Sequence, residues 1–329
     1  MQNIVQFKKD LFSVSPETFA EMALKLFRYQ AVENVVYREF LHYLDISSDS
    51  ITQIEDIPFL PIELFKTRKI ITGNADTPFY FESSGTTSAK NSRHFVFDHE
   101  IYKQSINHCF RLFFGDIKNY TLLALLPSYL DRPNTSLVYM CRELMFQSGR
   151  PENGFYLDNQ EALLKIILHN EENNIPTILI GVTFALLDLA ENFPLKLTNT
   201  IIMETGGMKG RRAEITRAEL HHILGEAFKT KNIYSEYGMT ELLSQAYSKG
   251  DSVFYTPSWM KILIRDTEDP LSKLPPERTG CINIIDLANI HSCAFIATQD
   301  LGKTHADGSF EVMGRFDNSD VRGCNLMVD

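Results

Sequence analysis

A run of small, hydroxylated residues is the part of this sequence best suited to bind an anion. It lies in FESSGTTSAKNSRH, residues 81–94, and five of its six members carry a hydroxyl group: Ser83, Ser84, Gly85, Thr86, Thr87 and Ser88. In such a loop the backbone N–H groups approach an anion closely, and the hydroxyl groups add further donors. Phosphate is the natural guest, and an ordinary solvated Ser/Thr turn is the alternative. The run does not match the GxxxxGK[ST] loop of nucleoside triphosphatases.

Two adjacent glycines follow an apolar, strand-like run at residues 200–203. In METGGMKGRR, Gly206 and Gly207 have no Cβ atom, so a flat ligand has room to approach the backbone. A tight turn from strand to helix needs the same residue types. The residues alone therefore leave both interpretations open.

A third segment, NIYSEYGMTE at residues 232–241, places aromatic and polar groups at the end of a strand-like run. Tyr237 offers a ring face for stacking. Thr240 and Glu241 put a hydroxyl and a carboxylate side by side, which suits a Mg²⁺ ion bridged to phosphates. An ordinary strand end is the alternative.

The stretches that position these residues alternate between strand-like and helix-like patterns. In chain order, the patterns predict a strand at 121–126, helices at 136–149 and 160–173, a strand at 176–180, a helix at 183–192, a strand at 200–203 and a helix at 212–229. This order is typical of an α/β fold whose largely parallel sheet has helices on its faces. In such folds, ligands bind beyond the carboxyl ends of the strands.

The two ends of the chain differ from this central part. Residues 15–45 carry apolar positions at helical spacing after a Ser15-Pro16 start. From about residue 253 the pattern changes to short β-type segments at 261–265, 280–287 and 292–297. We therefore expect an N-terminal helical segment packed on the core (1–75), an α/β core (76–252) and a β-rich subdomain with a short tail (253–329).

The charge and the apolar pattern limit the partners and the location. A net charge of −10 argues against non-specific binding to nucleic acid or to anionic membranes. The N-terminus lacks the basic and then apolar pattern of a signal peptide, and no run of 18 apolar residues occurs. The sequence thus predicts a cytoplasmic protein without membrane insertion.

Cysteine usage indicates thiols rather than disulfides. The five cysteines are an odd number and form no CxxC pair, which argues against a disulfide framework. A zinc site built from Cys281, His291 and Cys293 lacks the usual ligand spacing. We expect core or surface thiols.

The hydroxyl-rich run resembles the phosphate loop of adenylate-forming enzymes, a superfamily that activates carboxylic acids as acyl-AMP. The likeness rests on SSGTTSAK, residues 83–90, with Ser88 in place of a usual glycine and Lys90 in place of a usual proline. The lysine that follows the proline in the family corresponds to Asn91, and Arg93 is a substitute cation close by.

A second motif of that superfamily, Tyr-Gly-x-Thr-Glu, matches residue by residue. Its members here are Tyr237, Gly238, Thr240 and Glu241. The resemblance implies that Glu241 binds Mg²⁺, that Tyr237 and the two adjacent glycines frame adenine, and that the phosphate loop holds ATP. It also implies that Asp300, in ATQDLGK, binds the ribose hydroxyls, and that Arg315 lies on the ribose and phosphate side.

The end of the chain is similar to the hinge of these enzymes. Gly314-Arg315-x-Asp317 followed by Arg322-Gly323 resembles the segment after which they begin a mobile C-terminal domain with a catalytic lysine. This sequence stops six residues after Gly323, so we expect that domain to be absent. Cys324 follows the hinge glycine, and its thiolate could accept an acyl group as a thioester. An inert cysteine near a frayed end is the alternative.

A short adenylating chain with a cysteine near its end resembles the acyl-protein synthetases of the LuxE type. The similarity also covers residues 58–69, 125–140 and 204–212, and it runs over roughly residues 55–325. It implies an ATP- and Mg²⁺-dependent ligase that activates a carboxylic acid, a fatty acid by preference, and transfers it to Cys324. A reductase that consumes the thioester would be the partner. The alternatives are a ligase that uses coenzyme A or a carrier-protein thiol, and a degenerate fold that binds nucleotide or a partner without turnover.

Overall fold

The computed structural model describes residues 2–73, 79–83, 91–126, 134–206 and 215–316. The chain divides into two compact units, one formed by Met1–Thr77 with Ser258–Asp329 and the other by Pro78–Pro257. The three-part division expected from the sequence stays a prediction. We describe each unit by itself.

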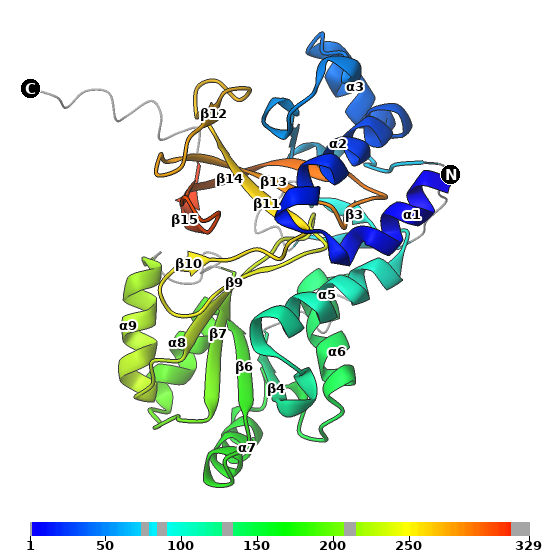
Figure 1. The fold of residues 1–329 in the computed structure, drawn as a ribbon. Coiled ribbons are helices and arrows are strands. Elements are labelled where there is room, and N and C mark those ends of the chain that lie inside the picture. The colour runs from blue at the N-terminus through cyan, green and yellow to red at the C-terminus, as the bar shows by residue number, and fades with distance from the viewer. Residues whose placement is uncertain (1, 74–78, 84–90, 127–133, 207–214, 317–329) are drawn as a thin grey trace, which may run out of the picture. The chain divides into compact units, whose positions relative to one another are not determined.

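The sheet of the unit Pro78–Pro257 is mostly parallel (Figure 1). Its strands follow the order β5 (Gly154–Phe155), β4 (Thr121–Leu125), β6 (Thr177–Val182), β7 (Thr200–Thr205), β8 (Ile233–Tyr237) and β9 (Ala246–Ser248). Neighbours from β5 to β8 are parallel, and β9 pairs antiparallel with β8. Every residue of β4 and β6 is buried, which explains why these strands read as continuous apolar runs.

Helices flank this sheet, with α8 and α9 on one side and α5 and α6 on the other (Figure 1). They are α5 (His99–Phe114), α6 (Ser136–Ser148), α7 (Gln160–Glu172), α8 (Thr183–Asn192) and α9 (Arg217–Phe228), with a 3₁₀ turn η4 at Ile117–Asn119. The predicted α/β class is therefore confirmed for this unit.

One helix start differs from the sequence prediction. The helix expected at 212–229 begins only at Arg217, because Thr216 and Glu219 form a capping box: the Glu219 N–H donates to Thr216 Oγ1 at 3.2 Å, and the Thr216 N–H donates to Glu219 Oε2 at 3.0 Å. The helix expected at 136–149 occurs as α6 and begins at Ser136, with Thr135 as its N-cap residue. Its predicted stop is confirmed, since Gly149 adopts the left-handed conformation at φ 67°.

A small antiparallel pair, β2 (Tyr80–Glu82) and β3 (Arg93–Phe95), belongs to the same unit, as does β10 (Val253–Phe254). The pair is anchored through Phe81, which is fully buried. Its ring centroid lies 5.2 Å from that of Tyr102 on α5 and 5.4 Å from that of Tyr139 on α6. These contacts fix β2 and β3 relative to the flanking helices.

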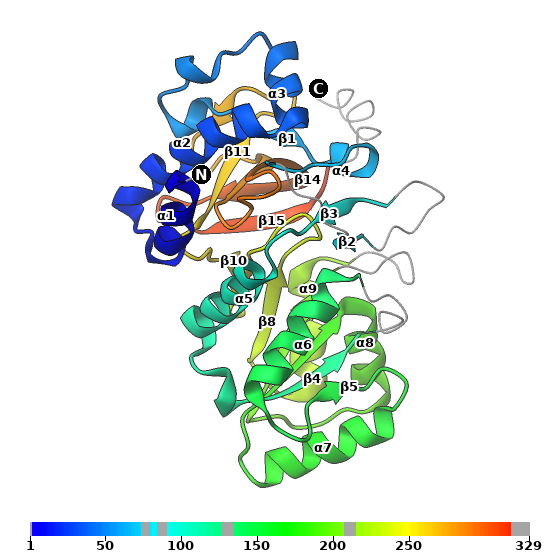
Figure 2. The same cartoon turned by 90° about the vertical axis from the view of Figure 1, so that its right-hand side faces the viewer.

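The second unit is built on an antiparallel sheet (Figure 2). Its strands follow the order β15 (Phe310–Arg315), β14 (Phe295–Thr304), β13 (Gly280–Asp286), β11 (Met260–Arg265) and β12 (Lys273–Leu274), and β1 (Leu60–Pro61) pairs parallel with β14. The helical pieces are α1 (Gln2–Asp10), η1 (Leu11–Ser13), α2 (Pro16–Glu33), α3 (Val35–Tyr43), η2 (Ser48–Ser50), η3 (Ile54–Asp56) and α4 (Leu64–Thr67). The predicted β-rich part thus forms one sheet with N-terminal helices beside it.

A buried glutamine joins α2 to this sheet. The Gln30 amide donates to the carbonyls of Asn289, Ile290 and Ser292 at 2.8 to 3.2 Å, and its Oε1 accepts the Ala294 N–H at 2.9 Å. These backbone groups are therefore satisfied by a side chain rather than by a strand. For that reason the strand expected at 292–297 begins later, at Phe295.

No helix in the described ranges is long and apolar enough to cross a membrane. Cys109, Cys141, Cys281 and Cys293 are buried, and none of these four forms a disulfide. Among the described side chains, no group of three His, Cys, Asp or Glu residues could hold a metal ion, so the zinc site considered above is not formed.

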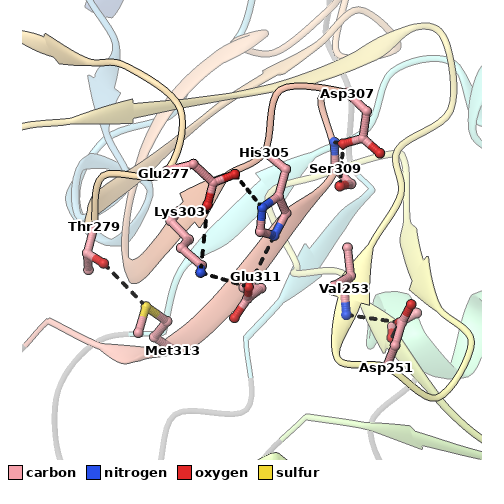
Figure 3. A network of polar contacts seen from close by, with 11 residues as sticks. Asp251, Val253, Glu277, Thr279, Lys303, His305, Asp307, Ser309, Glu311 and Met313 are labelled. Atoms are coloured by element: carbon pink, nitrogen blue, oxygen red, sulfur yellow. Dashed lines mark hydrogen bonds and ion pairs between the residues drawn. The ribbon is translucent and has the colours of Figure 1, made fainter.

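A network of charged side chains lies beside β14 and β15 and includes residues that flank these strands (Figure 3). His305 Nδ1 lies 2.8 Å from Glu277 Oε1, and His305 Nε2 lies 3.1 Å from Glu311 Oε1. Lys303 Nζ lies 3.1 Å from the same Glu311 oxygen. The charge of His305 also acts on the carboxyl group of Asp307. This group accepts a hydrogen bond from Ser309 Oγ. The hydrogen bond with Glu277 raises the pKa of His305.

The His305→Gln protein should lose a pH-dependent part of its stability. Because the folded-state pKa is raised, protonated His305 stabilises the fold fully below its unfolded value of about 6.5, and this contribution disappears as the pH rises through the folded-state pKa. Thermal unfolding should therefore show a Tm difference between wild type and variant at pH 5.5 that narrows by pH 8. A constant difference would contradict this, and His42→Gln, on an exposed helix position, is the control.

Candidate active site

The carboxyl ends of β7 and β8 lie side by side in the unit Pro78–Pro257. The two strands are parallel neighbours, with Thr205 opposite Glu236. Gly206 directly follows β7 with φ 71°, a left-handed conformation that favours glycine, and its carbonyl accepts a hydrogen bond from Thr183 Oγ1 at 3.2 Å. Gly238 directly follows β8. The structure thus brings together two of the glycine segments singled out in the sequence.

A buried carboxyl group that the sequence analysis missed joins these two strand ends. Thr205 Oγ1 donates to Glu236 Oε2 at 2.5 Å. A Cβ atom on Gly238 would lie 2.3 Å from Glu236 Oε1, so the position after Tyr237 accepts only glycine without rearrangement. Burial raises the pKa of Glu236 to about 7 against the opposing effect of the Thr205 bond, and the nearby charge of Glu204 adds to the increase. Glu236 could have been found from the sequence as a charged residue inside the strand-like run NIYSEY.

The Glu236→Gln protein should be more stable than wild type at pH 8. Because the pKa of Glu236 is higher in the folded state than in the unfolded state, the free energy of unfolding of the wild type falls as the pH rises from 4.5 to about 7. The decrease is on the order of 3 kcal/mol. A neutral amide has no such loss and can still accept the Thr205 bond. Urea unfolding at pH 5 and pH 8 measures the difference, which should be small at pH 5. If the free energy of unfolding depended on pH equally in the wild type and in Glu236→Gln, the raised pKa of Glu236 would be contradicted. Glu161→Gln, at an exposed position, is the control.

On the other face of the same strands, Glu204 is 3% exposed and paired. Arg217 Nε lies 3.0 Å from Glu204 Oε1, and His221 Nε2 lies 3.8 Å from it. Burial alone would raise the pKa of Glu204, but the nearby His221 and the charge of Arg217 outweigh it and lower the pKa. The Arg217 guanidinium lies 4.8 Å from the Phe254 ring centroid, and that ring meets the Tyr237 ring edge-on at 5.9 Å. This chain of contacts supports Tyr237, which is itself 8% exposed.

Thr240 and Glu241 lie in the turn after β8. Glu241 is 5% exposed, and the Thr240 carbonyl lies 2.8 Å from Nδ1 of His94 on β3. A single carboxylate fits Mg²⁺, which is usually bound through one or two carboxylates together with substrate phosphates. The lack of a three-ligand group among the described residues is compatible with an ion held mainly by a nucleotide.

Ser83 stands at the end of β2. Its N–H donates to the Ser92 carbonyl at 3.0 Å, and its Oγ accepts the Ser92 N–H at 2.9 Å. These two hydrogen bonds hold Ser83 and Ser92 together, and the other phosphate-loop residues lie between them in the sequence. Six predicted site residues lie outside the described ranges: Ser84, Gly85, Thr86, Thr87, Gly207 and Cys324.

Asp300 and Arg315, the last two predicted site residues, belong to the unit formed by Met1–Thr77 with Ser258–Asp329. Asp300 on β14 is paired in register with Arg315 on β15, and Arg315 Nε lies 3.9 Å from Asp300 Oδ1. The Asp300 side chain is 17% exposed, whereas that of Arg315 is 85% exposed. The two residues are neighbours, as a shared role requires, and that role stays a prediction.

A sequence comparison finds one distant relative over nearly the whole chain. The sequence is 22% identical over 343 residues to the long-chain-fatty-acid–luciferin-component ligase of Aliivibrio fischeri, covering 96% of this chain and 89% of that protein. No protein-family model matches.

Solved structures of adenylate-forming enzymes share the fold. ATP-bound MatB from Rhodopseudomonas palustris aligns with a TM-score of 0.56 at 15% identity, covering 72% of this chain and 47% of that one. A long-chain-fatty-acid-CoA ligase from Archaeoglobus fulgidus aligns at 0.51 and 16% identity, covering 73% and 52%. A 2-hydroxyisobutyryl-CoA ligase in complex with 2-HIB-AMP and CoA aligns at 0.65 and 10% identity, covering 91% and 70%.

The chain spans about half the length of the first two of these structures, and identities this low establish the fold alone. The chain is therefore a distant homologue of the long-chain-fatty-acid–luciferin-component ligase, with the fold of the adenylate-forming enzymes.

Proposed function

We propose that this protein uses ATP to activate a carboxylic acid, a fatty acid by preference, as acyl-AMP, and then transfers the acyl group to the thiol of Cys324. The observation that carries the proposal is the arrangement at the carboxyl end of β8: the strand ends at Tyr237, Gly238 and the buried Glu241 come after it, and Gly206 follows the neighbouring strand β7. The name of the distant relative supports a long-chain fatty acid as the substrate of a ligase.

In the first step, a carboxylate oxygen attacks the α-phosphorus of ATP. A phosphorus–oxygen bond to the acyl group forms, and the bond to pyrophosphate breaks. This barrier is mainly one of charge and positioning. Hydroxyl and backbone donors of Ser83, Ser84, Gly85, Thr86 and Thr87 would hold the phosphates, and Glu241 beside Thr240 would hold Mg²⁺, which supplies charge neutralisation. Gly206, Gly207 and Tyr237 would frame adenine, with Asp300 and Arg315 at the ribose.

In the second step, the Cys324 thiolate attacks the acyl carbonyl. A carbon–sulfur bond forms, the acyl–oxygen bond breaks, and AMP leaves with the electron pair. The other cysteines are poor candidates for this role. Burial raises the pKa of Cys293 to about 12, and it also raises the pKa values of Cys141 and Cys281, while Cys109 is fully buried.

Intact-protein mass tests the complete proposal. The protein is incubated with MgATP and one carboxylic acid at a time, from short through aryl to long-chain fatty acids. The proposal predicts an added mass of one acyl group that hydroxylamine removes, with the acid of highest yield naming the substrate. Absence of any adduct together with acyl-CoA formation on addition of coenzyme A would instead favour an external thiol. Two structural relatives are CoA ligases, which makes coenzyme A a specific rival acceptor.

A further inference from the structure

A buried histidine connects the β2–β3 pair to the turn that carries Thr240 and Glu241. His94 lies on β3 opposite Phe81 of β2 and is fully buried. Its Nδ1 lies 2.8 Å from the Thr240 carbonyl oxygen, which is 146 residues away in the sequence. Because a carbonyl only accepts, Nδ1 must carry the hydrogen.

The turn after β8 also contains a hydrogen bond of its own. Residues 238–242 lie beyond the last strand residue, Tyr237, and within them the Leu242 N–H donates to the Met239 carbonyl at 3.1 Å. The bond from His94 comes from outside the turn, from a side chain on β3. Breaking such a buried bond leaves a desolvated carbonyl and carries a substantial free-energy cost.

The frame from which His94 reaches the turn is itself fixed. Phe81, its cross-strand partner, packs against two aromatic rings, and two residues away from His94, Ser92 exchanges hydrogen bonds with Ser83. The β2–β3 pair therefore has Ser83, a predicted phosphate-binding residue, at its end, and it contacts the predicted metal-binding turn through His94.

We propose that His94 is a positioning residue that holds the Thr240–Glu241 turn against the β2–β3 pair, so that Ser83 and Glu241 stay in one fixed frame. This inference rests on the proposed function as far as ATP and Mg²⁺ are concerned. The tether itself is a property of the fold and can be tested without activity.

Three substitutions separate the hydrogen bond from the bulk of the ring. His94→Asn keeps an N–H donor close to the Nδ1 position, His94→Gln moves it to the Nε2 position, and His94→Leu removes it. We expect the Gln and Leu proteins to need about tenfold more Mg²⁺ for half-maximal pyrophosphate release, and the Asn protein to remain within about threefold of wild type. Phe81→Leu, which weakens the same β pair but keeps the donor, should lower Tm without this shift.

Hydrogen exchange at the Leu242 amide is the second readout. It should accelerate about tenfold in His94→Gln and His94→Leu but not in His94→Asn. Unchanged exchange in all three variants, or an equal change in all three, would overturn the inference. If wild type itself releases no pyrophosphate in response to carboxylic acids, the proposed function fails, and the exchange data still decide the tether.

Discussion

The Cys324→Ala protein should release pyrophosphate at the wild-type rate and gain no acyl mass. None of the groups assigned to the first step is Cys324, so acyl-AMP formation should be unaffected, whereas the second step loses its nucleophile. Pyrophosphate release and intact mass, measured on the same samples with MgATP and the best acid, check both halves of this result.

The matched control is Cys281→Ala, because Cys281 is 1% exposed and burial raises the pKa of its thiol. This protein should still gain the acyl group. A hydroxylamine-labile adduct that persists in Cys324→Ala would show that another residue is acylated, and the assignment of the acceptor would be wrong.

The Glu241→Gln protein should release pyrophosphate at least about 100-fold more slowly than wild type. The substitution keeps the shape of a side chain that is 5% exposed but removes the charge that a magnesium ion requires. The rate is measured as a function of Mg²⁺ at saturating ATP and acid. Half-saturation should also move to a higher Mg²⁺ concentration.

Glu161→Gln removes one carboxylate from the exposed start of α7 and provides the control for a general charge effect. Its rate and its Mg²⁺ dependence should match wild type. A Glu241→Gln protein that did the same would exclude Glu241 as the metal-binding group, even if the adenylating activity itself were established.

Much of the fold could be predicted from the sequence because its elements have local signals. The strand expected at 121–126 occurs as β4, Thr121–Leu125, since a strand buried on both faces needs an unbroken apolar run. The helix expected at 183–192 occurs with the same limits. The boundaries that moved depend on side chains of other segments, as with Gln30 and the late start of β14.

The candidate site could be predicted only in part, for a related reason. Tyr237, Gly238, Thr240 and Glu241 are contiguous, so their residue types form a readable motif. His94 and Glu236 have no such signal. The contact from His94 spans 146 residues, and the significance of Glu236 depends on Thr205 in a neighbouring strand. Pairings across parallel strands are set by tertiary packing, which residue spacing along the chain does not encode.

The exchange of radiolabelled pyrophosphate into ATP tests the activation of a carboxylic acid most directly, because it requires acyl-AMP to form reversibly. We expect label to enter ATP only when MgATP and a carboxylic acid are both present. Exchange should persist in Cys324→Ala and fall by at least about 100-fold in Glu241→Gln. Absence of acid-dependent exchange across short, aryl and long-chain acids, in a protein that binds ATP, would contradict the account.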